Sequence, residues 1–266
     1  MISVKDAQEL QALILGWKAD GLKVGFVPTM GALHEGHLSL MRIAKEKADK
    51  VVVSIYVNPT QFAPHEDFDA YPRDVEGDAA LLDSVGVDAL YLPLESDIYP
   101  DGAQVTVQAG KAAEGLETQF RPHFFHGVAT VVYRLFNVVR PDLAVFGEKD
   151  FQQLQVIKEM VASKDMGVEI IGGSIARDEF GLALSSRNAY LSEGELEIAR
   201  MLNQIIHNAA LEPTDEQLAD AEQMLLTAGF DKVDYVAYRA DWGRILAAGW
   251  VGKTRLIDNC EAQKPA

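Results

Sequence analysis

Cysteine, positive charge and long apolar runs are all scarce in this chain of 266 residues. The one cysteine, Cys260, excludes an intrachain disulfide and a cysteine-rich metal site. The 24 lysines and arginines face 40 aspartates and glutamates, and the formal net charge of −16 argues against nonspecific binding to nucleic acid or anionic membranes. No apolar run is long enough to span a bilayer, and residues 1–20 are typical of a mixed-polarity helix rather than a signal peptide. We therefore expect a cytoplasmic protein without nucleic-acid or membrane partners.

Segments with strand and helix periodicity alternate over the first two-thirds of the chain. Buried strands are predicted at residues 24–27, 51–57, 89–92, 143–146 and 168–171. Helices are predicted between them, at residues 38–48, 74–84, 127–140 and 149–164. Residues 99–122 lack either period and are expected to form a loop. This alternation predicts an α/β fold, a Rossmann-like parallel sheet with helices on both faces.

The pattern changes after Asn188. Predicted helices at 192–211 and 214–228 and strands at 233–238 and 254–257 indicate a smaller α+β domain. We place the domains at residues 1–176 and 177–266. The P-loop-like string at residues 247–254 lacks its first glycine and precedes a strand, so we interpret it as chance. The chain also has no Gly-x-Gly-x-x-Gly fingerprint, which disfavours a dinucleotide dehydrogenase.

The most informative stretch is Pro28–His37, with the sequence PTMGALHEGH. It connects a predicted strand to a predicted helix, and ligands of open α/β sheets bind at such turns. A helix that starts near Gly36 would direct unpaired N–H groups towards an anion. The histidine spacing differs from the His-Glu-x-x-His zinc motif, while an imidazole N–H can donate to a phosphoryl oxygen. We predict that His34 and His37 face phosphate rather than a metal.

Three further polar stretches follow predicted strands or lie near the domain boundary. The amides of Asn58–Phe62 suit hydroxyl and carboxylate groups, although a simple strand stop explains them equally well. In Gly147–Gln153, Lys149 stands at a helix N-terminus, where a cation is unfavourable unless an anion is near. Leu184–Asn188 offers two hydroxyls and an arginine for a polyphosphate, with a polar linker as the alternative.

Together these motifs resemble those of the pantothenate synthetase family, the pantoate–β-alanine ligases of coenzyme A synthesis. The resemblance covers about residues 23–259 and rests on PTMGALHEGH, VNPTQF, FGEKDFQQL, ALSSRN and TRLIDN in this order. It implies condensation of (R)-pantoate with β-alanine through a pantoyl adenylate, with release of pyrophosphate and AMP. It also implies ATP with Mg²⁺ as a substrate complex, no metal site made by the protein, and a homodimer. The superfamily is that of the nucleotidyltransferases with a His-x-Gly-His turn.

The resemblance further assigns roles to residues at matching positions. His37, His34, Lys149 and Arg187 would form the catalytic group, with His37 as the family's proton donor. Pantoate would contact Gln61 and Gln153 together with Asn58, and Gln61 would also border β-alanine. The C-terminal domain is expected to close over ATP. The residues implied in ATP binding are Met30, Gly31, Ala32, Leu33, His34, Glu35, Gly36, His37, Gly147, Glu148, Lys149, Asp150, Ala176, Leu184, Ser185, Ser186 and Arg187.

The chain departs from the family pattern in one place, where RPGHFxGV is usual. Residues 121–128 read RPHFFHGV, so Phe124 replaces the usual histidine and His123 the usual glycine. His123 or His126 substitutes for that histidine, or the segment only flanks the site. Ala176 stands for a more frequent valine, which is harmless if its contact is made by main chain. Two other functions stay open: a related nucleotidyltransferase with a phosphorylated acceptor, and a nucleotide sensor without turnover.

Overall fold

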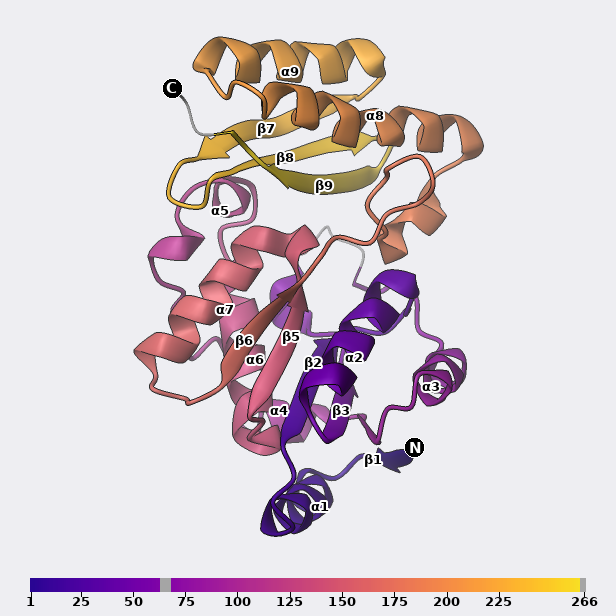
Figure 1. The fold of residues 1–266 in the computed structure, drawn as a ribbon, viewed down its shortest axis with the longest axis vertical. Helices are drawn as coiled ribbons and strands as arrows, with labels where there is room; N and C mark the ends of the chain where they lie inside the picture. The colour runs from indigo at the N-terminus through magenta and orange to yellow at the C-terminus, as the bar shows by residue number, and fades with distance from the viewer. Residues whose placement is uncertain (63–67, 264–266) are drawn as a thin grey trace. The chain divides into compact units, whose positions relative to one another are not determined.

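The computed structural model describes residues 1–62 and 68–263, and these form two compact units. The larger unit comprises Met1–Glu148 and Gln152–Ser174, and the smaller unit comprises Lys149–Phe151 and Ile175–Ala266. The larger carries a parallel sheet and the smaller an antiparallel sheet (Figure 1). Among the residues described, no helix is both long and apolar enough to cross a membrane.

A six-stranded parallel sheet in the order β1-β4-β3-β2-β5-β6 organises the larger unit. Its strands are β1 (Ile2–Val4), β2 (Val24–Thr29), β3 (Lys50–Ile55), β4 (Ala89–Tyr91), β5 (Leu143–Gly147) and β6 (Glu169–Gly173). The five predicted strands and their parallel arrangement are confirmed. The prediction of helix over residues 1–20 is wrong at its start, because residues 2–4 pair with β4 as an edge strand.

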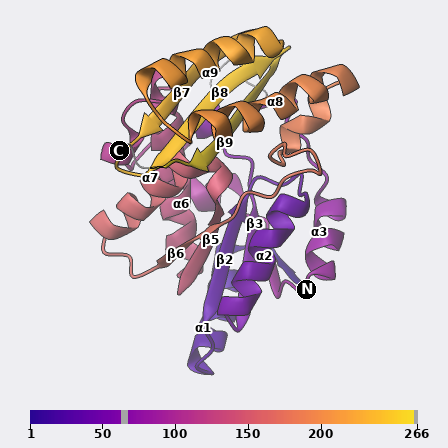
Figure 2. The same cartoon turned by 45° about the horizontal axis from the view of Figure 1, so that its top comes forward.

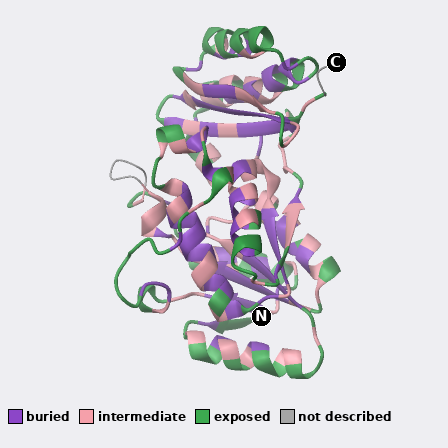
Figure 3. Ribbon diagram, turned by 90° about the vertical axis from the view of Figure 1, so that its left-hand side faces the viewer, coloured by how far each residue is buried: buried purple, intermediate pink, exposed green. Residues whose placement is uncertain are grey.

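Helices cover both faces of this sheet, as predicted (Figure 2). They are α1 (Ala7–Ala19), α2 (Glu35–Lys47), α3 (Val75–Ser84), α6 (Phe124–Val139) and α7 (Phe151–Ser163), with the short α4 (Glu95–Ile98) and α5 (Glu117–Phe120). Successive residues of β2 point to opposite faces. Val27 belongs to the core cluster that holds Met41 of α2, whereas Phe26 packs edge-to-face on Phe136 of α6, with ring centroids 6.0 Å apart. Buried residues line these strands in Figure 3.

Residues 99–122, predicted as a loop, contain only single turns of helix. These are the 3₁₀ turn η2 (Lys111–Ala113) and α5. One buried glutamine ties the segment to α7: the Gln152 amide donates to the carbonyls of Ala112 and Gly115, at 3.1 and 3.3 Å. Its Oε1 accepts from the backbone N–H of Glu117 at 3.2 Å. Gln152 therefore orders a segment that has little regular structure of its own.

The smaller unit is a three-stranded antiparallel sheet with two helices packed on it. Its elements are α8 (Glu193–Ala209), α9 (Asp215–Ala228), β7 (Lys232–Arg239), β8 (Arg244–Val251) and β9 (Thr254–Glu261). The predictions missed β8, which overlaps the P-loop-like string. In the structure Gly252, with φ of +57°, makes the hairpin turn between β8 and β9. The interpretation of that string as chance is thereby confirmed.

Asp88 fastens α2 to the sheet. Its carboxylate accepts from Lys45 Nζ at 3.0 Å, Lys50 Nζ at 3.1 Å and the Val51 N–H at 2.9 Å. Burial alone would raise the pKa of Asp88, but these donors outweigh burial and hold the pKa below its ordinary value. Because the folded pKa is lower than the unfolded one, the stabilisation is complete above the unfolded pKa and is lost as the pH falls through the folded pKa.

We expect Asp88→Asn to lower the free energy of unfolding by about 1–2 kcal/mol at pH 7, since it removes a charge that accepts three hydrogen bonds. Urea titrations at several pH values measure this loss. The difference from wild type should narrow below about pH 4, where the unfolded carboxyl is protonated. Asp83→Asn, which removes an exposed carboxylate, is the control and should cost less than about 0.5 kcal/mol. A loss for Asp88→Asn that stayed constant with pH would contradict this account.

Candidate active site

Three of the four polar stretches follow three neighbouring strands. β2 lies between β3 and β5, and all three run parallel. Pro28–His37 begins with the last two residues of β2, and Asn58–Phe62 follows β3. Gly147 is the last residue of β5, and Glu148 follows it. Parallel strands end at the same edge of a sheet, so these stretches share one edge of the larger unit. The fourth stretch, Leu184–Asn188, belongs to the smaller unit.

The turn after β2 has a backbone conformation that requires glycine at residue 31. Gly31 and Ala32 have φ of +83° and +50°, so two successive residues are left-handed. A Cβ on residue 31 would lie 3.0 Å from a carboxylate oxygen of Asp78 and 3.1 Å from the Ile55 side chain. Glycine is therefore needed at residue 31 for both its φ and its lack of a side chain.

A buried carboxylate that the sequence analysis missed holds this turn. Asp78 of α3 is 4% exposed, and its two oxygens accept from the N–H groups of Ala32 at 3.0 Å and Leu33 at 2.8 Å. Burial raises the pKa of Asp78, and the two N–H donors oppose that rise. The only sequence signal was an acid near the start of a helix, which is common for structural reasons alone.

Both histidines of the turn cap α2, which begins at Glu35, three residues before the helix predicted at residues 38–48. His34 Nδ1 accepts from the Gly36 N–H at 3.1 Å, and His37 Nδ1 accepts from the His34 N–H at 3.3 Å. Their ring centroids are 4.1 Å apart. An Nδ1 that accepts a hydrogen bond carries no proton, so Nε2 is the protonated nitrogen of each neutral ring. Each histidine is thereby set to donate through Nε2, which agrees with a phosphate-facing role.

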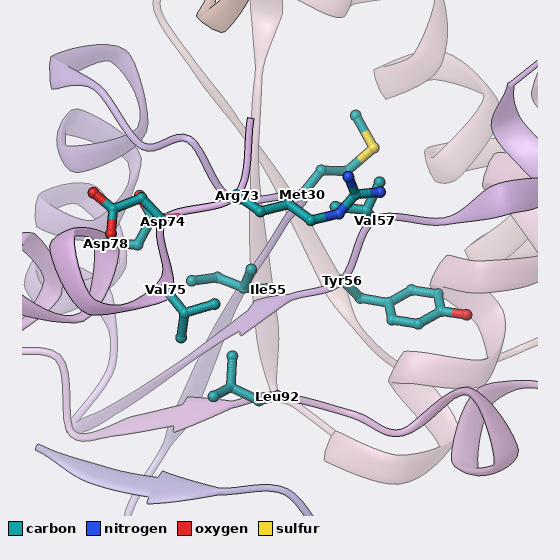
Figure 4. A pocket seen from close by; sticks show the side chains of 10 residues that line it. Met30, Ile55, Tyr56, Val57, Arg73, Asp74, Val75, Asp78 and Leu92 are labelled. Carbon is teal, nitrogen blue, oxygen red and sulfur yellow. The ribbon is translucent and has the colours of Figure 1, made fainter. Parts of the chain in front are cut away.

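A pocket of about 260 Å³ borders the turn. Side chains from the turn, the ends of β3 and β4 and the start of α3 surround it (Figure 4). The lining residues are Met30, Gly31, Ile55, Tyr56, Val57, Arg73, Asp74, Val75, Asp78 and Leu92. The Arg73 guanidinium donates to backbone carbonyls, including that of Phe68 at 2.9 Å, and Asp78 is engaged by the turn. The pocket is therefore mainly an apolar hollow against which the turn rests.

The stretch after β3 forms a 3₁₀ turn, η1 (Pro59–Gln61), capped by Asn58. Asn58 is fully buried and its Nδ2 donates to Gln61 Oε1 at 2.8 Å, whereas Gln61 itself is half-buried. A Cβ on Gly127 of α6 would lie 2.3 Å from the Thr60 carbonyl oxygen, so this close approach requires glycine. Gly127 of the HGV sequence therefore allows η1 to pack closely against α6.

The departure from the family pattern lies beside η1. Phe124 stacks under the Arg121 guanidinium, whose carbon is 3.7 Å from the ring centroid, and Arg121 donates to the Gln61 carbonyl at 3.2 Å. His126 Nδ1 accepts from the Ala109 N–H at 2.9 Å, while His123 is exposed. Phe124 therefore supports a residue that holds Gln61, and His126 has a structural partner.

In the smaller unit, Lys149 of the EKD motif contacts the TRLIDN motif. Lys149 lies in the 3₁₀ turn η3 (Glu148–Asp150) just before α7, with Nζ 3.6 Å from the Asp150 carboxylate. Its carbonyl accepts from Asn259 Nδ2 of β9 at 3.0 Å. The neighbouring Asp258 binds the Arg177 guanidinium through both carboxylate oxygens, at 2.7 and 2.9 Å. The TRLIDN motif therefore holds two segments in place, one at Lys149 through Asn259 and one at Arg177 through Asp258. The sequence alone indicated no such role for it.

The serine–arginine stretch forms a 3₁₀ turn, η4 (Ser186–Tyr190). Ser185 caps it, because its Oγ accepts from the Arg187 N–H at 3.3 Å. Ala176 and Leu184 are joined by a backbone hydrogen bond of 2.9 Å, which brings the two ends of the Arg177–Ala183 segment together. Ala176 and the serine–arginine stretch therefore lie in one local structure of the smaller unit.

A comparison with known protein families identifies the family of this chain. The model of the pantoate-β-alanine ligase family matches residues 2–261. The chain belongs to the pantoate–β-alanine ligase family. It is 52% identical to the pantothenate synthetase of Mesorhizobium japonicum, over 97% of this chain and 96% of that protein. It is 51% identical to the pantothenate synthetase of Hyphomonas neptunium, over 96% of this chain and 94% of the relative.

Solved structures of this family agree with the fold. Pantothenate synthetase from Thermus thermophilus gives a TM-score of 0.85 at 40% identity, over 98% of this chain and 99% of that one. The pantoate-β-alanine ligase of Francisella tularensis, solved with β,γ-ATP and β-alanine, gives 0.88 at 37% identity, over 98% and 97%. The predicted α/β fold and the predicted ligase, which joins pantoate to β-alanine, are confirmed. Family membership favours this ligase over a phosphorylated-acceptor nucleotidyltransferase or a sensor without turnover.

Proposed function

We propose that this ligase activates pantoate with ATP before it joins pantoate to β-alanine. A pantoate carboxylate oxygen attacks the α-phosphorus, the bond to the departing pyrophosphate breaks, and pantoyl adenylate forms. The β-alanine amine then attacks the acyl carbon, the bond to AMP breaks, and the amine loses a proton as the amide forms. The observation that carries this proposal is the capped turn of α2, where two histidines keep Nε2 as their donor at a helix N-terminus. The Francisella relative, solved with β,γ-ATP and β-alanine, supports it.

The proposed catalytic groups are His34 and His37 on the larger unit and Lys149 and Arg187 on the smaller unit. His34 and His37 would donate to phosphoryl oxygens as negative charge builds on the departing pyrophosphate, with His37 as the proton donor. Lys149 would supply a point charge, and Arg187 two parallel donors. Lys149 and Arg187 would supply the positive charge that a chain with a net charge of −16 needs to bind a polyanion. The ATP contacts implied for the α2 turn, Gly147–Asp150, Ala176 and Leu184–Arg187 are part of this proposal.

Pantoate is proposed to bind Gln61 and Gln153, with Asn58 beside them, and β-alanine to lie next to Gln61. Amide side chains bind both the hydroxyl and the carboxylate groups of pantoate, because they offer donors and an acceptor without net charge. No covalent intermediate on the protein is required. The protein would act mainly by orienting two reactants and by stabilising charge.

Magnesium is proposed to enter with ATP, bound by phosphate oxygens. Across residues 1–62 and 68–263, no group of three or more histidine, cysteine, aspartate or glutamate residues is placed to hold a metal. The division at residue 176, the closing of the C-terminal domain over ATP, the homodimer and the cytoplasmic location remain predictions from the sequence.

Pantoate labelled with ¹⁸O in its carboxylate tests the adenylate. The attacking oxygen stays on phosphorus when the acyl bond breaks, so AMP should carry one ¹⁸O. Mass spectrometry of AMP and ADP measures this, and AMP should appear only when both pantoate and β-alanine are present. Label in inorganic phosphate together with ADP would instead indicate an acyl phosphate. ATP consumption that is indifferent to either co-substrate would refute the proposed reaction.

A further inference from the structure

The buried amide of Asn58 connects Gln61 to a tyrosine that lies far away in the sequence. Asn58 Oδ1 accepts from the Tyr99 hydroxyl at 2.6 Å and from the Thr60 hydroxyl at 3.0 Å. Asn58 Nδ2 donates to Gln61 Oε1 at 2.8 Å. Both ends of this fully buried amide are therefore bound within the protein.

Two backbone groups fix which end of the Asn58 amide is oxygen. The Thr60 N–H, which can only donate, points to Oδ1 at 3.4 Å, and the Gly127 carbonyl, which can only accept, lies 3.4 Å from Nδ2. Since Nδ2 can only donate, Gln61 must turn Oε1 towards it. The Nε2 group of Gln61 is then its remaining end, and this group donates to no acceptor among the described residues.

We propose that Tyr99 is a positioning residue, which through Asn58 sets Gln61 to present its Nε2 donor to the oxygens of pantoate. This inference rests on the proposed binding of pantoate by Gln61. Tyr99 is 2% exposed, and its ring lies under the Arg134 guanidinium, whose carbon is 4.9 Å from the ring centroid. Burial raises the pKa of the Tyr99 hydroxyl, so the group keeps the proton that it donates.

The polarity of Gln61 matters because pantoate offers mainly oxygen acceptors. A Gln61 amide turned by about 180° would place Oε1 against those oxygens and repel them. Tyr99 adds to the two backbone groups that disfavour this rotation, because its hydroxyl makes the shortest hydrogen bond to Asn58 Oδ1, at 2.6 Å. The effect should not extend to ATP, which is proposed to bind other residues.

Tyr99→Phe tests this inference because it removes the hydroxyl alone. We expect the KM for pantoate to rise by about 5-fold to 10-fold, the effect of one hydrogen bond, while the KM for ATP stays within about twofold of wild type. Tyr91→Phe is the matched control, since Tyr91 is a fully buried tyrosine on β4 outside this cluster. It should leave both KM values within about twofold of wild type. Thermal unfolding of each variant identifies any general loss of structure.

Thr60→Val provides a second test if Tyr99→Phe does not fold. It removes the other hydroxyl on Asn58 Oδ1 and should also raise the KM for pantoate selectively. A pantoate KM within twofold of wild type in the folded variant, or equal rises for pantoate and ATP, would overturn the role of Tyr99. A wild-type protein that forms no AMP from pantoate and β-alanine would instead overturn the proposed function, so the two failures can be told apart.

Discussion

Replacing Lys149 with alanine is expected to slow pantoyl-adenylate formation by about 10²-fold to 10³-fold, the usual cost of removing a group that stabilises transition-state charge. The loss should come from the side chain alone. The backbone at residue 149 should keep its position in the variant, because Asn259 donates to the Lys149 carbonyl at 3.0 Å and not to its side chain. The side-chain contact is with Asp150, 3.6 Å from Nζ, and an isolated pair of this kind contributes little to stability.

Single-turnover release of pyrophosphate, with pantoate and ATP but no β-alanine, measures this step directly. Lys158→Ala is the matched control, because Lys158 is an exposed lysine on α7, the helix that follows Lys149. It should release pyrophosphate at the wild-type rate with the same thermal stability. Near-normal release by Lys149→Ala would remove Lys149 from the proposed catalytic group.

The sequence predicted most of the larger unit because the central strands of its sheet are largely buried. Runs such as Val51–Val53 are almost entirely apolar and β-branched, which distinguishes them from helix. β1 escaped prediction because three residues are too short to show a period. β8 escaped because RILAAGWV is apolar after Arg244, without alternation, and its end overlaps a string that resembles a different motif. Local pattern therefore failed where pairing with a neighbouring strand decides the structure.

The positions of the polar motifs were predictable for a topological reason. Three of them follow strands, and parallel strands end at the same edge, so the order of motifs along the chain placed these three together. The residues that support the motifs were not predictable in this way. Asp78 lies 45 residues from Leu33, and Tyr99 lies 41 residues from Asn58. Only the folded structure shows that these buried groups hold the turn and the amide.

The Asp78→Ala variant should lose both stability and adenylate formation. It leaves the N–H groups of Ala32 and Leu33 without their buried acceptor, which costs about 1–3 kcal/mol for each group that water does not reach. The turn also contains the left-handed Ala32, a conformation that costs about 1–2 kcal/mol outside glycine. Without the carboxylate this turn should relax, and the histidines that follow it should move from their places at the N-terminus of α2.

Urea unfolding and single-turnover pyrophosphate release separate these two effects when Asp74→Ala is used as the control. Asp74 also lies at the start of α3 and lines the same pocket, but its carboxylate caps α3 by accepting from the Gly77 N–H at 2.9 Å. Its loss should cost about 1 kcal/mol of stability and leave pyrophosphate release close to wild type. Asp78→Ala should instead slow release by about 10-fold or more, as expected when catalytic groups are displaced by about 1 Å. If Asp78→Ala loses stability but releases pyrophosphate normally, then glycine and the α2 cap alone are sufficient to hold the histidines.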